Sequence, residues 1–343
     1  MDRLPLVSVI VLNYNNKKYL GPCIDSVLKS DYPNLELVFV DNASSDGSTD
    51  FVKKRFGSES SLKIVQNSEN LGYAGGNNVG VDFATGEYLV FLNNDTEVDR
   101  NWLCELVTVM ESDRNIGAAQ GKLISTYNRK RFDNVGGFID RLGFSILRGL
   151  QEEDEGQYDK CSEIFFAIGA AFAVRRNVLN EVGLFDYAYF LYYEDVDLCW
   201  RIQLRGYKIV FVPKCVVFHA GGASSRKERL YKNLPEYHKH KNHITTLLKN
   251  YELFNLIRYM PVAVFLEVLS DFVSFKSDRF VRIRGIIYNI GNFDKIWKKR
   301  IEVQKKIRKK KDIALFEKGL ILPFNLKLLK ANLKRLKVEN ERS

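Results

Sequence analysis

The first third of the sequence alternates short runs rich in β-branched apolar residues with amphipathic segments, and this alternation restricts the fold more than any other feature. Apolar runs of about four to eight residues are typical of buried strands, whereas apolar residues that recur every three or four positions are typical of helices. Strands that alternate with helices in this way form a parallel sheet with helices on both faces. The predicted strands are residues 7–12, 35–40, 63–66 and 87–92, and the predicted helices are residues 17–29, 48–56, 74–84 and 102–113.

Polar residues follow each of the four predicted strands. In sheets of this class ligands bind beyond the carboxyl ends of the strands, so these loops indicate where a site would lie. Asn, Asp and Gly also form turns and helix caps, which is a sufficient explanation for any one loop. Four such loops at one edge of the sheet favour a site for a polar ligand. The loops are Asn13-Tyr14-Asn15, Asp41-Asn42-Ala43-Ser44, residues 67–78 and Asn93-Asn94-Asp95.

A second patterned block begins at Gly169, after a less regular segment, residues 118–166, to which we assign no elements. The glycine-rich and basic stretches of that segment are compatible with a surface loop beside a ligand site. In the second block, Gly206 is typical of a left-handed helix cap and predicts where a helix that begins near Asp195 ends. The other predicted elements are an apolar run at 169–174, a helix near 176–182 and strands at 208–212 and 216–218.

Three side chains of this pattern have the chemistry of a metal-assisted transfer site. Asp95 directly follows a strand, where its carboxylate can hold a divalent ion against phosphate oxygens, and His219 follows another strand. Histidine beside carboxylate and phosphate oxygens suits Mn²⁺ or Mg²⁺. Asp195 begins a helix whose dipole favours the ionised carboxylate that a general base needs. The alternatives are a structural histidine at 219 and an aspartate at 195 that only stabilises its helix.

The cysteines and the apolar runs bear on the compartment. Five cysteines are scattered and never form a C-x-x-C pair, so we expect reduced thiols in the cytoplasm. We expect neither a signal peptide nor a spanning helix. The best candidate for a span, residues 253–272, is interrupted by Arg258, Pro261, Glu267 and Asp271.

Charge divides the chain into two unequal parts. Residues 1–225 carry 23 Lys and Arg against 30 Asp and Glu, a net charge of −7, whereas residues 226–343 carry 29 against 12, a net charge of +17. A basic helical tail with apolar side chains predicts binding to an anionic membrane surface. The alternative is that these helices pack on the preceding domain or form a homodimer. Nucleic acid is not expected as a partner, because the positive charge lies outside the α/β part and no binding motif accompanies it.

Seven segments, in order, resemble glycosyltransferase family 2, in particular its rhamnosyltransferase-like bacterial and archaeal members. They cover about the first 225 residues. The resemblance implies a GT-A catalytic domain at residues 1–225. The helical basic region at residues 226–343 lies outside the resemblance, and its charge and apolar side chains predict association with the cytoplasmic face of the membrane. The segments are residues 9–15, 40–48, 70–77, 92–95, 183–186 and 193–201 together with His219.

The resemblance also implies a role for each matching position. It predicts an inverting, metal-dependent transferase that uses a nucleotide-sugar donor, with one divalent ion, Mn²⁺ or Mg²⁺, at the D-x-D position. One departure is that the first position of D-x-D is Asn93, which is a weaker metal partner than aspartate, so the donor diphosphate would supply much of the coordination. The implied residues are Asp195 as base, Asn13, Tyr14, Asp41, Asn70, Gly72, Asn77 and Asn94 at the donor, and Asp95 and His219 at the metal.

The residues do not choose the donor sugar. By resemblance it is dTDP-L-rhamnose, with UDP-hexoses or UDP-galactofuranose as alternatives, and the acceptor is a hydroxyl of a glycan or polyprenyl-linked oligosaccharide in cell-surface polysaccharide synthesis. A non-catalytic sugar-nucleotide-binding module is a further alternative. The presence of both Asp95 and Asp195 is evidence against it.

Overall fold

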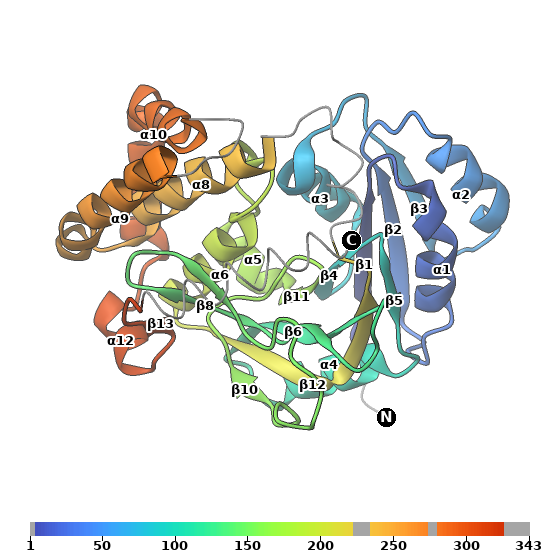
Figure 1. Ribbon diagram of the computed structural model, residues 1–343. Coiled ribbons are helices and arrows are strands. Elements are labelled where there is room, and N and C mark those ends of the chain that lie inside the picture. The colour runs from blue at the N-terminus through green and yellow to red at the C-terminus, as the bar shows by residue number, and fades with distance from the viewer. Residues whose placement is uncertain (1–3, 222–233, 274–279, 326–343) are drawn as a thin grey trace.

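The protein is built around one large mixed sheet. A computed structural model describes residues 4–221, 234–273 and 280–325 (Figure 1). The sheet has ten strands, eight of them in the order β10-β12-β6-β11-β4-β1-β2-β3, with β5 and β7 paired at its side. The predicted α/β class with a Rossmann-like mixed sheet is confirmed.

All four strands predicted in the first third are present, and they run parallel to one another. The register places Asn13 opposite Asp41 and Leu12 opposite Asn93, so the polar residues at the strand ends are neighbours. The helices begin and end within two residues of the predicted bounds. The elements are β1 (Val7–Asn13), α1 (Lys17–Leu28), β2 (Leu35–Asp41), α2 (Ser48–Phe56), β3 (Leu62–Gln66), α3 (Gly72–Phe83), β4 (Tyr88–Asn93), β5 (Thr96–Val98) and α4 (Trp102–Ser112).

The segment left unassigned from the sequence consists mainly of strands. β6 lies inside the large sheet between β12 and β11, and a separate small sheet has the order β13-β8-β9. Four of the strands in this segment have only two to four residues, too few for a periodic pattern to be read. The five strands of the segment are β6 (Ile116–Ser125), β7 (Phe132–Asn134), β8 (Gly137–Asp140), β9 (Ser145–Leu147) and β10 (Ser162–Glu163).

The second patterned block supplies the antiparallel part of the sheet. β11 runs antiparallel to both β4 and β6. The two strands predicted at 208–212 and 216–218 are one continuous strand, β12, whose pairing with β6 shifts register between Val212 and Val216. The elements are β11 (Ala171–Arg175), α5 (Arg176–Val182), the short helix η1 (Tyr187–Tyr189), α6 (Glu194–Arg205) and β12 (Lys208–His219).

Two hydrophobic cores lie on opposite faces of the sheet. Val9 and Val11 of β1 face the core covered by α1, α2 and α4, whereas Ile10 faces the core that contains α3, α5 and α6. The alternation follows from the strand period of two. The five cysteines all lie in the described part of the chain, and none of them forms a disulfide.

Helices from the C-terminal region pack on the second core. Leu247 and Tyr251 are fully buried in the same apolar cluster as Ile10 of β1, and the helices gather on one side of the molecule, opposite α1 and α2 (Figure 1). The predicted domain boundary at residues 225 and 226 lies outside the described residues. The elements are α8 (Leu234–Asn250), α9 (Leu253–Val273), α10 (Val281–Gly291), α11 (Phe293–Glu302), η3 (Val303–Ile307), α12 (Asp312–Glu317) and β13 (Ile321–Leu322).

One helix in the described ranges, Leu253–Phe272 within α9, is long and apolar enough to cross a membrane by length and composition alone, with a mean hydropathy of 1.5. The interruptions seen in the sequence therefore do not remove it from this class. Glu267 and Asp271 are buried and paired with residues of α8 and α10, such as His240 and Arg282. The two acidic side chains of α9 thus face the protein, whereas Arg258 and large apolar side chains such as Phe254 and Phe265 are exposed.

Candidate functional site

The ends of β1, β2 and β4 are joined by buried side-chain hydrogen bonds. The Asn13 amide donates to Asp41 Oδ1 at 3.0 Å and to Ser44 Oγ at 3.1 Å, and its oxygen accepts from Asn94 Nδ2 at 2.7 Å. Asp41 also accepts from the Ser44 backbone N–H at 2.9 Å. The structure therefore brings together three of the predicted donor residues, Asn13, Asp41 and Asn94, in one rigid polar floor. Tyr14 follows β1 at the same edge and is half-buried.

A second set of polar contacts forms the loop that precedes α3. Asn70 Oδ1 accepts from Asn42 Nδ2 at 2.8 Å and from the Gly72 N–H at 2.9 Å. Gly72 has a φ of +68°, and a Cβ there would lie 2.5 Å from the ring and the carbonyl oxygen of Phe190, so only glycine fits. Asn77, by contrast, is buried within α3 and donates to the Tyr73 carbonyl at 2.9 Å, apart from these contacts.

The candidate metal ligands lie where β4 and β12 end. His219 Nε2 is 3.3 Å from Asp95 Oδ1, and both side chains are nearly buried. The other ring nitrogen, Nδ1, is 2.8 Å from Asp133 Oδ2. Burial lowers the pKa of His219, but Asp95 and Asp133 outweigh this effect and raise it well above its usual value. The position therefore favours a positive charge.

This geometry suits a divalent ion. Among the described residues no group of three or more His, Cys, Asp and Glu side chains is arranged to hold a metal. Asp95 and His219 would thus be the two protein ligands, and oxygen atoms of a substrate would complete the shell. Asp133 would orient the imidazole through Nδ1, as carboxylates commonly do behind metal-binding histidines.

Asp133 is a candidate site residue that the sequence analysis missed. It lies on β7, which pairs with β6 next to the end of β12. Nothing in its local sequence distinguishes it, because it follows the basic stretch Asn128–Arg131 in the segment without periodicity. Only the pairing of β6 with both β7 and β12 brings Asp133 to His219.

Asp195 begins α6 at the end of a strained loop. Phe190, Tyr192 and Tyr193 all have φ values between +62° and +66°, which is uncommon for residues other than glycine. Such conformations persist where the surrounding structure enforces them, often at functional sites. Glu194, the neighbour of Asp195 in the chain, is buried, and its Oε2 atom has no hydrogen-bond partner among the described residues.

The environment of this pair opposes ionisation. Burial raises the pKa of Asp195 to about 6, against hydrogen bonds from the N–H groups of Val196 and Gly169 that lower it. Burial and the adjacent Asp195 raise the pKa of Glu194 well above its usual value. Burial therefore opposes the ionisation of both carboxyl groups. A carboxylate with a pKa near 6 is a suitable general base.

The candidate base Asp195 and the candidate metal ligand Asp95 are connected through the two residues that precede β11. The Gly169 N–H donates to Asp195 Oδ2 at 3.2 Å, and the next residue, Ala170, accepts at 3.1 Å from the N–H of Asn93, two residues before Asp95. The loop before α3 meets the same region, because the N–H of Ala74, in the first turn of α3, donates to the Phe190 carbonyl at 3.2 Å. Asp195, Asp95 and the loop before α3 therefore border one region at the carboxyl edge of the parallel strands.

Known proteins with similar sequences or structures include glycosyltransferases. The y4gI protein of Sinorhizobium fredii is 27% identical over 66% of this chain and 26% of its own length, and the O-antigen biosynthesis protein RfbC of Myxococcus xanthus is 27% identical over 66% of this chain and 18% of its own. The chain thus spans about a quarter or less of these relatives. A solved mannosyltransferase from Pyrobaculum calidifontis, in complex with GDP-Man and Mn²⁺, has the same fold, with a TM-score of 0.54 and 19% identity over 88% of this chain and 86% of its own.

The family itself follows from a match that covers half of the chain. The model of glycosyl transferase family 2 matches residues 8–183, from β1 to the end of α5. This range contains the polar floor, the loop before α3 and Asp95. Asp195 and His219 lie beyond it. The chain belongs to glycosyl transferase family 2.

Proposed function

We propose that this glycosyltransferase transfers a sugar from a nucleotide donor with inversion, with Asp195 as the base. The observation that carries the proposal is the position of Asp195, whose carboxylate accepts from the Gly169 N–H at 3.2 Å and borders the same region as Asp95 and the loop before α3. Burial raises the pKa of Asp195 to about 6, which suits a group that accepts a proton near neutral pH. An attack from the side opposite the leaving group inverts the anomeric configuration.

The residues divide the work as follows. Asn13, Asp41 and Asn94 form the polar floor on which the nucleoside lies, and Asn70 and Gly72 shape the loop beside the donor. Asp95 and His219 would hold the divalent ion, and Asp133 would orient the imidazole ring of His219. When bound, the ion neutralises the charge that develops on the departing diphosphate. Asp195 takes the proton of the acceptor hydroxyl as its oxygen attacks the anomeric carbon.

The donor we propose first is dTDP-L-rhamnose, with UDP-hexoses and UDP-galactofuranose as alternatives. The mannosyltransferase of the same fold was solved with GDP-Man and Mn²⁺, which supports a nucleotide sugar and a divalent ion here without specifying either. The acceptor we propose is a glycan or a polyprenyl-linked oligosaccharide in cell-surface polysaccharide synthesis, which the similarity to an O-antigen biosynthesis protein supports.

A thermal-shift screen tests the donor assignment. A ligand that binds only the folded state raises the melting temperature, by an amount that grows with its concentration over Kd. The screen compares dTDP-, UDP- and GDP-sugars, each with Mn²⁺, with Mg²⁺ and with EDTA. We expect one nucleotide class to stabilise the protein only when a divalent ion is present. Stabilisation that is the same with EDTA would contradict the metal-dependent donor site.

We propose that the protein works at the cytoplasmic face of a membrane with anionic lipids, through the outer face of α9. This face consists of side chains that are 44–73% exposed: Phe254, Ile257, Phe265, Leu269 and Phe272. Helix α9 is therefore inverted relative to an ordinary surface helix, since it buries Glu267 and Asp271 and exposes phenylalanine. The excess of positive charge in residues 226–343 complements anionic headgroups.

Flotation with liposomes tests the membrane assignment. We expect the full-length protein to float with vesicles that contain phosphatidylserine, at low salt and in part at high salt. Each basic residue near the membrane surface contributes about 1 kcal/mol of binding free energy that salt screens. The binding free energy from aromatic rings inserted into the lipid does not depend on salt in this way. Replacement of Phe254, Phe265 and Phe272 by serine is expected to abolish flotation. Phe83→Ser, which removes a half-exposed ring from α3, is the matched control. If the triple variant floats like the wild type, α9 is not the contact.

A further inference from the structure

One face of α8 contacts the segment that carries the candidate base. Residues 242, 246, 249 and 250 are spaced by four, three and one positions, so they share one side of the helix. All four side chains are buried. We refer to Asn242, Thr246, Lys249 and Asn250 as the α8 face. It belongs to the part of the chain beyond the family match.

The side chain of Asn242 binds backbone carbonyl groups of the strained loop. Its amide nitrogen lies 2.9 Å from the Tyr189 carbonyl, 2.9 Å from that of Leu191 and 2.6 Å from that of Tyr192. Three carbonyl oxygens that converge on one donor hold the main chain on both sides of Phe190. The left-handed residues of the loop are thus enforced by a side chain from a helix about fifty positions later in the sequence.

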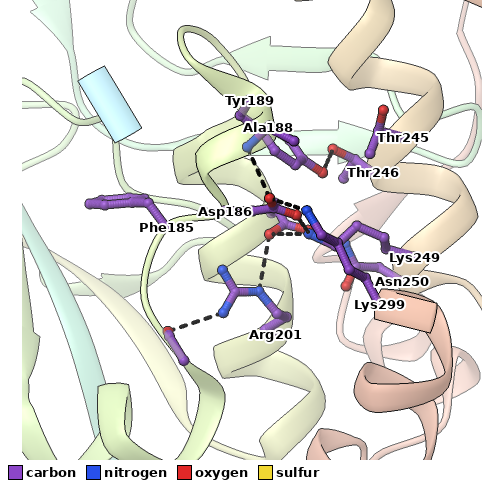
Figure 2. A network of polar contacts seen from close by, with 12 residues as sticks. Phe185, Asp186, Ala188, Tyr189, Arg201, Thr245, Thr246, Lys249, Asn250 and Lys299 are labelled. Atoms are coloured by element: carbon purple, nitrogen blue, oxygen red, sulfur yellow. Dashed lines mark hydrogen bonds and ion pairs between the residues drawn. The ribbon is translucent and has the colours of Figure 1, made fainter. Parts of the chain in front are cut away.

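Lys249 binds α6 itself. Its ammonium group lies between Asp186 Oδ2, at 2.8 Å, and Asp197 Oδ2, at 3.0 Å, and Asn250 donates to Asp197 Oδ1 at 2.9 Å (Figure 2). Figure 2 shows Lys249 and Asn250 reaching from α8 towards Asp186. Asp197 is fully buried and lies two residues after Asp195. Lys249 therefore ties α8 both to the first turn of α6 and to the segment before it.

We propose that Asn242 and Lys249 are positioning residues for Asp195. Asn242 holds the loop that ends at Tyr193, Lys249 holds the first turn of α6, and Asp195 lies between these two anchors. The inference rests on the proposed role of Asp195 as the base and adds that the C-terminal region completes the active site. Within the described residues, neither Asn242 nor Lys249 forms a hydrogen bond or an ion pair with Asp195.

The test measures release of nucleoside diphosphate from the nucleotide sugar that most stabilises the wild-type protein, in the full-length chain. We expect Asn242→Ala and Lys249→Gln to lower kcat by about 10- to 100-fold, since a displacement of about 1 Å costs this much, with KM for the donor within about threefold. We also expect the acid limb of their pH profiles to shift, because the environment of Asp195 changes. Lys249→Arg, which keeps the charge, should recover part of kcat.

Lys299→Gln is the matched control. Lys299 binds the same Asp186 as Lys249. Within the described residues it forms no hydrogen bond or ion pair with Asp197 or another residue of α6. We expect its kcat within about twofold of the wild type. If Asn242→Ala does not fold, Lys249→Gln and its arginine counterpart carry the test.

Two outcomes separate the failure of this inference from failure of the proposed function. If Asn242→Ala and Lys249→Gln lower the melting temperature but leave kcat and the pH profile unchanged, the α8 face is structural only and the inference is wrong. If Asp195→Asn retains wild-type kcat, the base itself is wrongly assigned, whatever the α8 variants do.

Discussion

Two pairs of carboxylates lie within twelve residues of one another in the chain, and their surroundings give them opposite properties. Glu194 is buried and Asp195 is partly buried, and neither forms an ion pair with a cation among the described residues; burial raises the pKa of both. Asp197 is fully buried and Asp186 is partly buried, but Lys249 lies between them, and the nearby Lys299 and Arg201 add further positive charge. These cations outweigh burial and hold the pKa of Asp186 and of Asp197 below the usual value.

The difference shows that the partners of a carboxylate, more than its burial, decide what it can do. The pair with cations stays ionised and supports the fold, because its charge is matched within hydrogen-bond distance. The pair without cations is harder to ionise, and Asp195, whose pKa burial raises to about 6, is available for proton transfer. Since Asp195 and Asp197 are separated by one residue on the same helix, substitutions at these two positions compare the two environments directly.

The largest effect we expect is on turnover. Asp195→Asn keeps the shape of the side chain but cannot accept a proton, so kcat should fall by about 10²- to 10⁴-fold, while affinity for the nucleotide with Mn²⁺ remains close to that of the wild type. Single-turnover kinetics and calorimetry with the nucleotide measure the two quantities. Retention of more than about half of the wild-type kcat would contradict the assignment.

The same substitution at the two aspartates should change stability in opposite directions. Asp197→Asn leaves Arg201 without its carboxylate and leaves Lys249 with Asp186 alone, so it is expected to cost about 3 kcal/mol or more. Asp195→Asn removes a carboxylate whose folded-state pKa is raised, so its ionisation opposes folding above about pH 6. We expect its melting temperature at pH 8 to be higher than that of the wild type. Calorimetric scans of both variants test the contrast, and a loss of stability in both would break it.

A third set of carboxylates extends the comparison to the metal site. His219 lies between Asp95 and Asp133, and we expect Asp95→Ala and His219→Ala to abolish most Mn²⁺-dependent donor binding. Asp133→Asn leaves the ligands in place and removes only the carboxylate behind the imidazole, for which a 10- to 100-fold loss of metal affinity is expected. Calorimetric titration with Mn²⁺ measures the series. Normal metal binding by His219→Ala would make it a structural histidine.

The smallest effect is the pH dependence of the wild-type enzyme. Asp195 must be ionised to act as a base, and its pKa is raised to about 6. We expect kcat to be constant above about pH 7 and to fall about tenfold for each pH unit below 6. Asp186 and Asp197 remain ionised throughout this range, since their pKa values are lowered. Rates between pH 5 and pH 8 measure this limb, and a flat profile would contradict the ionisation proposed for Asp195.

The strands and helices of the first third could be predicted because their signals are local. The apolar period of Val7–Asn13 and the amphipathic pattern of Lys17–Leu28 are set by neighbours in the sequence, and the polar residues after each strand mark the edge where ligands bind in such sheets. The family motifs add Asp95, Asp195 and His219 by position. The sequence by itself therefore determines the fold class, the family and the candidates for the site.

What only the tertiary structure decided are the contacts between segments that are distant in the sequence. Asp133 reaches His219 because β6 pairs with both β7 and β12, and no local pattern encodes that pairing. Lys249 of the basic tail is a buried partner of Asp197, although its composition suggested a solvated or membrane-facing charge. Whether a carboxylate is ionised depends on which cations the fold places within a few ångströms of it, so the opposite pKa shifts of Asp195 and Asp197 are visible only in three dimensions.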